Sequence, residues 1–118
     1  MIKNYITCDK VTDQNSHDGQ GEIEIQKVFR REELKGVWDF ALRVTMPANS
    51  SMGSNIHGDE EEMYIILKGQ GVMTIDGKQQ SVVEGDMILN RPFGEHGLLN
   101  NSDKDIVLLI IQASNKTV

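Results

Sequence analysis

The segment Trp38-Asp39-Phe40-Ala41-Leu42-Arg43-Val44-Thr45-Met46 decides the fold class of this chain. Large apolar residues occupy every second position from Trp38 to Met46, and smaller or polar residues stand between them. Because successive side chains of a β-strand point to opposite faces, this alternation predicts a strand with one buried face. Pro47 cannot donate a ladder hydrogen bond, so the strand is expected to end at Met46.

The rest of the chain repeats this strand-like pattern, and only Arg30–Leu34 suggests a helical turn. Asp76-Gly77 is a dipeptide that supplies two positive-φ residues to a type I′ turn, so the strands on either side are expected to pair antiparallel. We therefore predict an all-β fold with less than about 10% helix. Further strands are expected at Glu22–Phe29, Met63–Leu67, Gly71–Ile75, Gln79–Val83, Asp86–Leu89 and Ile106–Gln112.

Closely spaced glycines between Gly69 and Gly97 favour a barrel or jelly roll of short strands joined by tight turns. The polar segment Thr12–Gly21 is expected to form a mobile arm or a loop. A chain of 118 residues fits one domain. We therefore divide it into an N-terminal arm or strand at residues 1–21 and a single barrel domain at residues 22–118.

Charge and composition argue against several function classes. The chain has 12 Lys and Arg residues against 18 Asp and Glu residues, a net charge of −6, so neither nucleic acid nor a membrane surface is expected as partner. The longest apolar run, Ile106–Ile111, is far shorter than the roughly 20 residues that span a bilayer. Cys8 is alone, and the N-terminus lacks the apolar core of a signal peptide, so we expect a structural thiol in a cytoplasmic protein.

Two of the three histidines, His57 and His96, lie in segments that are rich in glycine and acidic residues and that flank predicted strands. Two imidazoles and a carboxylate on neighbouring strands form a typical site for a divalent transition metal, because these donors suit Fe, Mn, Ni, Zn or Cu. The alternative reading is that each histidine lies at the surface without a function.

From Pro47 to Asn100 the sequence resembles the cupin family, whose two motifs surround its metal site. The first motif is Gly, five residues, His-x-His, three or four residues, Glu, six residues and Gly. His57, four residues, Glu62, six residues and Gly69 reproduce the end of this motif. The second motif, Gly, a short gap, Pro-x-Gly, two residues, His, three residues and Asn, is matched with one residue more before the proline and one fewer before the histidine. Its matching residues are Gly85, Pro92, Gly94, His96 and Asn100.

The resemblance implies a small single-domain cupin, with a conical antiparallel β-barrel of jelly-roll type and one divalent transition metal per chain. His57, Glu62 and His96 fill three of the four usual ligand positions, and Fe, Mn, Ni and Zn are the candidate metals. Asn55 stands where the family has its first histidine, so it either coordinates weakly through its amide or leaves a position open. Two alternatives stay open: Asp59 replaces Glu62 as ligand, or the chain is a cupin that has lost its metal.

Three further side chains are candidates for contact with a substrate. Strand alternation from Glu62 places Tyr64 on the metal side, as a proton donor, as a hydrogen-bonding group or simply as a core aromatic. Arg43 is either a carboxylate anchor or an ordinary solvent-facing arginine. His17 could fold over the barrel mouth as an acid or base, since its ordinary pKa is near neutrality. The same alternation places Ile66 and Leu98 on the pocket wall, whereas Glu60-Glu61 is expected to be a solvated, charged turn.

Two classes of function follow from this reading. The first is a metal-dependent enzyme that acts on a small polar metabolite, by Lewis-acid isomerase or lyase chemistry or by oxygen activation at Fe(II). The alternative is a non-catalytic module that binds a small sugar or organic acid, because a fold does not fix a function. The resemblance also implies a homodimer, formed through Glu22–Phe29 or through the apolar run Ile106–Ile111.

Overall fold

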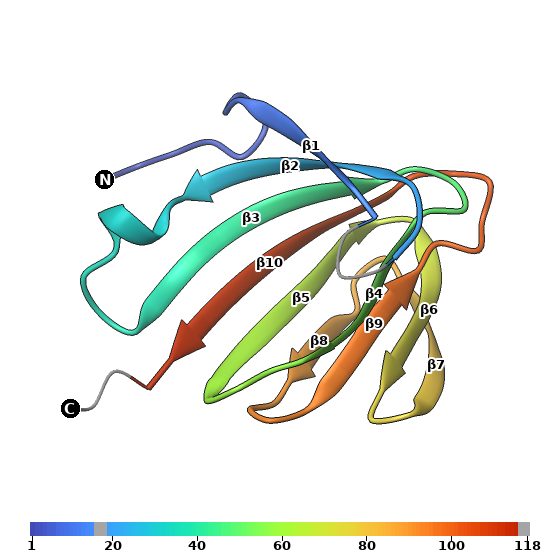
Figure 1. Ribbon diagram of the computed structural model, residues 1–118. Helices are drawn as coiled ribbons and strands as arrows, with labels where there is room; N and C mark the ends of the chain where they lie inside the picture. The colour runs from blue at the N-terminus through green and yellow to red at the C-terminus, as the bar shows by residue number, and fades with distance from the viewer. Residues whose placement is uncertain (16–18, 116–118) are drawn as a thin grey trace.

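The computed structural model describes residues 1–15 and 19–115, which form two antiparallel sheets around one core (Figure 1). The strand order is β1-β2-β3-β10-β5-β8 in the six-stranded sheet and β4-β9-β6-β7 in the four-stranded sheet. The strands are β1 (Lys10–Gln14), β2 (Glu22–Phe29), β3 (Trp38–Met46), β4 (Ser51–Ile56), β5 (Glu60–Lys68), β6 (Gln70–Ile75), β7 (Lys78–Val83), β8 (Met87–Asn90), β9 (Glu95–Leu99) and β10 (Ile106–Ser114).

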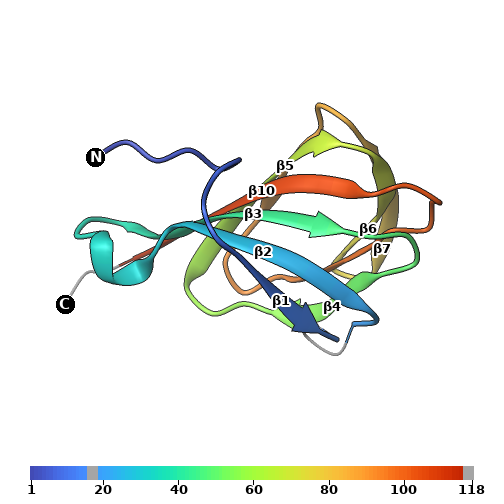
Figure 2. The ribbon, with the colours of Figure 1, turned by 90° about the horizontal axis from the view of Figure 1, so that it is seen from above.

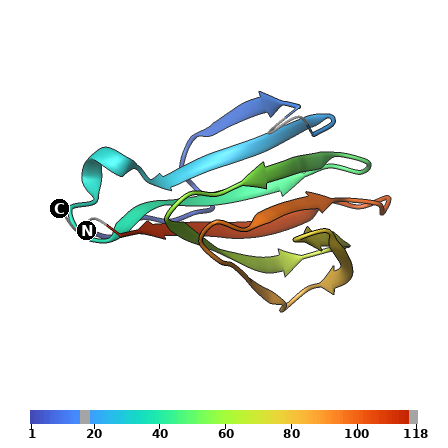
Figure 3. The same cartoon turned by 60° about the horizontal axis from the view of Figure 1, so that its bottom comes forward.

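The predicted all-β class is confirmed, because the described residues contain only one short 3-10 helix, Arg31–Glu33. This helix and the end of β10 lie at one end of the molecule, and β6 and β7 lie at the other (Figure 3). The strands β2 and β3 have the predicted bounds. The two sheets give a jelly roll that is not hydrogen-bonded into one closed cylinder.

Three strands were not predicted from the sequence. β1 and β4 are largely polar, and β9 carries His96 and Gly97 where a hydrophobic pattern would be expected. Pairing forms them instead: β1 joins the edge of the sheet beside β2 (Figure 2), and β9 lies between β4 and β6. The segment Thr12–Gly21, expected as an arm or loop, therefore begins as a strand.

The hairpin between β6 and β7 has the predicted turn. Ile75 pairs with Lys78, so Asp76 and Gly77 are the two turn residues. Their φ angles are 48° and 81°, as a type I′ turn requires. The Asp76 carboxylate also accepts a hydrogen bond of 2.9 Å from the backbone N–H of Glu95, which joins this hairpin to the start of β9.

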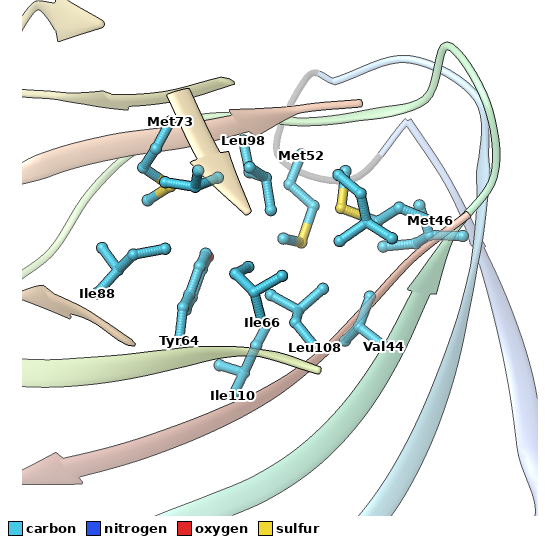
Figure 4. Close-up of a cluster of buried hydrophobic side chains, with 13 residues drawn as sticks. Val44, Met46, Met52, Tyr64, Ile66, Met73, Ile88, Leu98, Leu108 and Ile110 are labelled. Atoms are coloured by element: carbon cyan, nitrogen blue, oxygen red, sulfur yellow. The ribbon is translucent and has the colours of Figure 1, made fainter. Parts of the chain in front are cut away.

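The core lies between the two sheets and is filled mainly by aliphatic side chains and methionines (Figure 4). The inward face of β3 contributes Val44 and Met46, which are 1% and 0% exposed. At the start of the same strand the expected alternation is wrong, because Asp39 is buried whereas Trp38 is 54% exposed. The register between β3 and β10 shifts next to Gln112, and the Gln112 amide donates a 3.0 Å hydrogen bond to the Asp39 carboxylate.

The N-terminal segment is attached to the outside of the six-stranded sheet. The buried Gln26 side chain donates a 2.9 Å hydrogen bond to the backbone carbonyl of Cys8. The Arg43 guanidinium lies 5.2 Å from the centre of the Tyr5 ring and donates to Gln26. Among the described residues, no helix has the length and hydropathy needed to cross a bilayer.

Asn100, the last residue of the second motif, joins the loops at one end of the sheets. Its side chain is fully buried, and its amide N–H groups lie 2.9 Å from the carbonyl of Met46 and 2.7 Å from that of Lys104. Its oxygen accepts hydrogen bonds from the backbone N–H and the hydroxyl of Ser102. The backbone N–H of Asn100 also donates to the carbonyl of Ser50 (2.9 Å), so this one residue joins the entry to β4 to the exit from β9.

We predict that Asn100→Ala lowers the free energy of unfolding by about 2–3 kcal/mol, because it leaves buried backbone carbonyls without donors. The measurement is urea denaturation followed by circular dichroism. Asn101→Ala, at the exposed neighbouring position, is the control. Equal unfolding midpoints for the two variants would contradict this role of Asn100.

Candidate metal centre

The fold brings together the three residues that the sequence indicated as metal ligands. The Oε1 atom of Glu62 lies 3.2 Å from Nε2 of His96 and 3.5 Å from Nε2 of His57. One potential ligand atom from each residue lies within 4.8 Å of the others, and the side chains are 4–7% exposed. The two imidazole rings are stacked, with their centres 4.6 Å apart.

Three strand ends and two loops position this cluster. His57 follows β4, Glu62 lies near the start of β5, and His96 is the second residue of β9, where it pairs with Asn55 (Figure 1). The N–H of His57 donates to the carbonyl of Gly94 (2.9 Å), and the N–H of Phe93 donates to the carbonyl of Gly58 (2.8 Å). These two backbone bonds hold the loop that carries His57 against the loop that precedes His96.

Glu60 orients the His57 ring, although the sequence suggested only a solvated turn. Its Oε1 atom lies 3.2 Å from Nδ1 of His57 and accepts a 3.1 Å hydrogen bond from the N–H of Gly58. With the proton on Nδ1, the lone pair of Nε2 points toward Glu62, and this is the tautomer that a metal needs. The spacing of three residues after His57, across a tight turn, was the sequence signal for this contact.

Asn55 lies beside the same nitrogen. Its Nδ2 atom is 3.1 Å from Nε2 of His57. Turning the amide by 180° exchanges its nitrogen and oxygen. The same side chain can then present its oxygen to a metal at this point.

The donor set fits a divalent transition metal. Donors that share one ion at about 2.0–2.2 Å lie roughly 3 Å from one another, close to the separations of the Glu62 oxygen from the two imidazoles. A buried carboxylate next to two imidazole nitrogens also needs a cation or protons to offset its charge. Two imidazoles and one carboxylate suit Fe, Mn, Ni or Zn, whereas Asp59 is exposed and lies outside this cluster.

Tyr64 packs against the cluster. It is 5% exposed, and its ring meets that of His96 edge to face, with the centres 5.4 Å apart. Burial, and then the nearby Glu62 carboxylate, raise the pKa of Tyr64 well above its usual range. The phenol is therefore neutral near pH 7, where it can donate a hydrogen bond.

A cavity of about 180 Å³ adjoins Glu62, Tyr64 and His96. Pockets for drug-sized ligands measure roughly 300–1,000 Å³, so this cavity suits a molecule of few atoms. No Lys or Arg is among its lining residues, taken over the described part of the chain. The rest of the wall is mostly apolar: Ile23, Ile25, Phe40, Leu42, Val44, Met52 and Ile110, together with Asp13, Gly53 and Asn55.

Asp13 is a part of this cavity that the sequence did not indicate. It is the one residue of β1 that is not exposed, and it pairs with the buried Ile23. The surrounding sequence, Lys10–Gln14, is too polar to reveal an inward-facing position. Ile66 and Leu98, which were expected on the pocket wall, lie in the core and do not line the cavity.

The remaining candidates are not brought to the cluster. Arg43 alternates with Leu42 and Val44, which line the cavity, so it points to the opposite face of the sheet, where it contacts Gln26. His17 lies outside the described residues. Cys8 lies in the N-terminal segment outside the sheet, and its sulfur is 3.8 Å from the carbonyl of Tyr5.

The chain belongs to the cupin family. Residues 42–112 match the Cupin_2 family of cupin domains, and this range contains the His–Glu–His cluster and most of both sheets.

A curated protein and a crystal structure, both from Thermotoga maritima, are similar to it over nearly the whole chain. An oxalate-binding protein is 28% identical, with 90% of this chain and 86% of that protein covered. The crystal structure of a predicted oxalate decarboxylase superposes with a TM-score of 0.93 at 25% identity, covering 98% of this chain and 100% of that one. An uncharacterized protein of Methanocaldococcus jannaschii is 31% identical, with 92% and 77% covered.

We predict that Tyr64 makes stability fall at high pH. Because its pKa is higher in the folded protein, its contribution to stability is complete below the unfolded pKa of about 10 and is lost as pH rises through the folded pKa. In EDTA, the free energy of unfolding of the parent should therefore fall more steeply above about pH 10 than that of Tyr64→Phe.

Urea titrations at a series of pH values measure this slope, and Tyr5→Phe controls for the loss of a phenol. A parallel decline in the parent and Tyr64→Phe would contradict the prediction.

Proposed function

We propose that this protein binds one divalent transition metal through His57, Glu62 and His96, and that this centre binds a small carboxylic acid such as oxalate. The observation that carries the proposal is the buried His–Glu–His cluster, of which Glu62 and His96 line a cavity of about 180 Å³. The names of the Thermotoga matches support the choice of ligand class. Asn55 is proposed as a weak fourth donor that a chelating acid can displace.

The side chains of the cavity complete this picture. When bound, the metal supplies a Lewis acid that polarises carboxylate or carbonyl oxygens. The apolar wall excludes water around the ligand, which strengthens electrostatic interactions in the cavity. The neutral phenol of Tyr64, which lines the cavity, is proposed to donate a hydrogen bond to an anionic ligand. Because the described residues place no Lys or Arg on the cavity wall, we expect the cation held by the cluster to balance the charge of the ligand.

A second candidate function is turnover of the bound acid. Asp13 favours it, because a carboxyl group on the cavity wall can exchange a proton with a ligand held at the cluster. Lyase or isomerase chemistry fits this arrangement, and oxygen activation at Fe(II) is the variant with a redox metal. Homodimer formation and a cytoplasmic location stay predictions.

We predict that the protein, purified without a histidine tag, contains about one divalent ion per chain and that His96→Ala empties the site. Glu60→Ala should weaken metal binding by about 10- to 100-fold, because it removes the acceptor that orients His57. Elemental analysis and metal titration give these quantities.

Glu61→Ala, which removes the exposed neighbouring carboxylate, is the control. An unchanged metal content in His96→Ala would exclude the proposed ligand set.

We predict that the metal-loaded protein binds oxalate and that Asp13→Asn binds it about three- to tenfold more tightly, because the substitution removes a negative charge from the cavity wall. Isothermal titration calorimetry measures both affinities, and Asp9→Asn, at an exposed position, is the control. Absence of binding by the metal-loaded parent to oxalate and to other small acids would refute the proposed function.

The same variant separates binding from turnover. If Asp13 transfers a proton, Asp13→Asn binds oxalate but forms no product. A protein that only binds forms no product in either version, whereas equal turnover in both excludes Asp13 from the chemistry.

A further inference from the structure

The side chain of Asn90 is a buried amide with no hydrogen-bond partner among the described residues. It is the last residue of β8 and is 2% exposed. Neither its Oδ1 nor its Nδ2 atom has a hydrogen-bond partner within the described part of the chain. Ile88, two residues earlier, belongs to the core, so Asn90 shares the inward face of β8. Buried amides are nearly always hydrogen-bonded, and such an exception needs an explanation.

Asn90 is adjacent to the candidate metal centre. It pairs with Glu62 across the ladder between β5 and β8. Side chains of directly paired residues project from the same face about 5 Å apart, so the Asn90 amide and the Glu62 carboxylate are neighbours.

A second cavity, of about 160 Å³, is lined by Asn90 and by His96. It shares His96, and no other residue, with the cavity that adjoins Tyr64. Three exposed charged residues, Asp76, Arg91 and Glu95, also line it. The cavity therefore extends from a charged rim to the buried amide, and it has room and polar partners for several water molecules.

The two imidazoles of the cluster differ in the hydrogen bonds that their Nδ1 atoms make to the described residues. Nδ1 of His57 is held by Glu60, whereas the described residues provide no hydrogen bond to Nδ1 of His96. A metal-binding histidine nearly always donates its second N–H to a carboxylate, a carbonyl or a water, and this contact fixes the orientation of the ring.

We propose that Asn90 is a positioning residue of the metal centre, which holds the His96 ring through water in the second cavity as Glu60 holds the His57 ring directly. The inference rests on the metal binding proposed above. The amide oxygen accepts a hydrogen bond from a water that itself accepts the N–H of His96. Asn90 thereby acts on the metal through His96 and does not touch it.

The test is a titration of the metal-free protein with Co²⁺, which reports affinity and, by its visible absorption spectrum, the geometry of the centre. Asn90→Leu removes the amide at similar size, so it should bind Co²⁺ about tenfold more weakly, with an altered spectrum. Asn90→Ser keeps a neutral oxygen acceptor and should restore the affinity and spectrum of the parent. Met87→Ala, on the outer face of β8, should bind like the parent.

The metal-free variants supply a second readout. A leucine side chain has no polar atoms that need hydrogen bonds when buried. Asn90→Leu should therefore unfold at a urea concentration equal to or above that of the parent. Weaker Co²⁺ binding by a variant of undiminished stability supports positioning. If Asn90→Leu does not fold, Asn90→Ala takes its place in the Co²⁺ titration.

The outcomes separate this inference from the proposed function. A parent that binds no Co²⁺ overturns the proposed metal centre itself. A parent that binds Co²⁺, with Asn90→Leu equal to it in affinity and spectrum, overturns only the role of Asn90. A failure of Asn90→Ser to restore binding also overturns it, because a neutral acceptor at this position should serve.

Discussion

The structure depends on placing one carboxylate and two imidazoles inside an apolar interior. Glu62, His57 and His96 are each less than 10% exposed, and burial of such groups is unfavourable unless they face one another or a cation. The ends of the strands that carry these residues must therefore keep fixed positions relative to one another. Two backbone hydrogen bonds between the β4–β5 loop and the β8–β9 loop hold them there. Asn100 fixes the opposite end of β9 and the entry to β4, so the cluster is held from both ends of the same strands.

The sequence was sufficient where side-chain alternation coincided with burial. β2, β3 and the β6–β7 hairpin could be predicted because their periodicity and turn residues are local properties. β1, β4 and β9 could not, since their polar residues are strands only by virtue of the neighbours with which they pair. The exposure of Trp38 and the burial of Asp39 could not be predicted for the same reason. They accompany a register shift between β3 and β10, and this shift depends on the partner strand.

The candidate site divides in the same way. His57, Glu62 and His96 could be found because motif spacing specifies them, and the fold places them together. The residues around them could not be found from spacing. Asp13 faces the cavity because of its strand partner, and Asn90 is adjacent to Glu62 only across a ladder. The positions of such supporting residues depend on tertiary contacts, and these cannot be predicted from the local pattern of a single sequence.

The wall of the cavity near Tyr64 has parts of unequal rigidity. The side formed by Glu62 and Ile110 belongs to β5 and β10, which are paired on both edges, whereas Asp13 belongs to β1, which is paired with β2 alone. Strands at the edge of a sheet open locally at a lower free energy than central strands, so amide hydrogens should exchange sooner in β1 than in β10. The cavity can thus change its volume at β1, while the candidate metal-ligand atoms of the cluster keep their spacing. For the proposed ligand, the soft wall tolerates differences in size, and the stiff wall selects by chemistry.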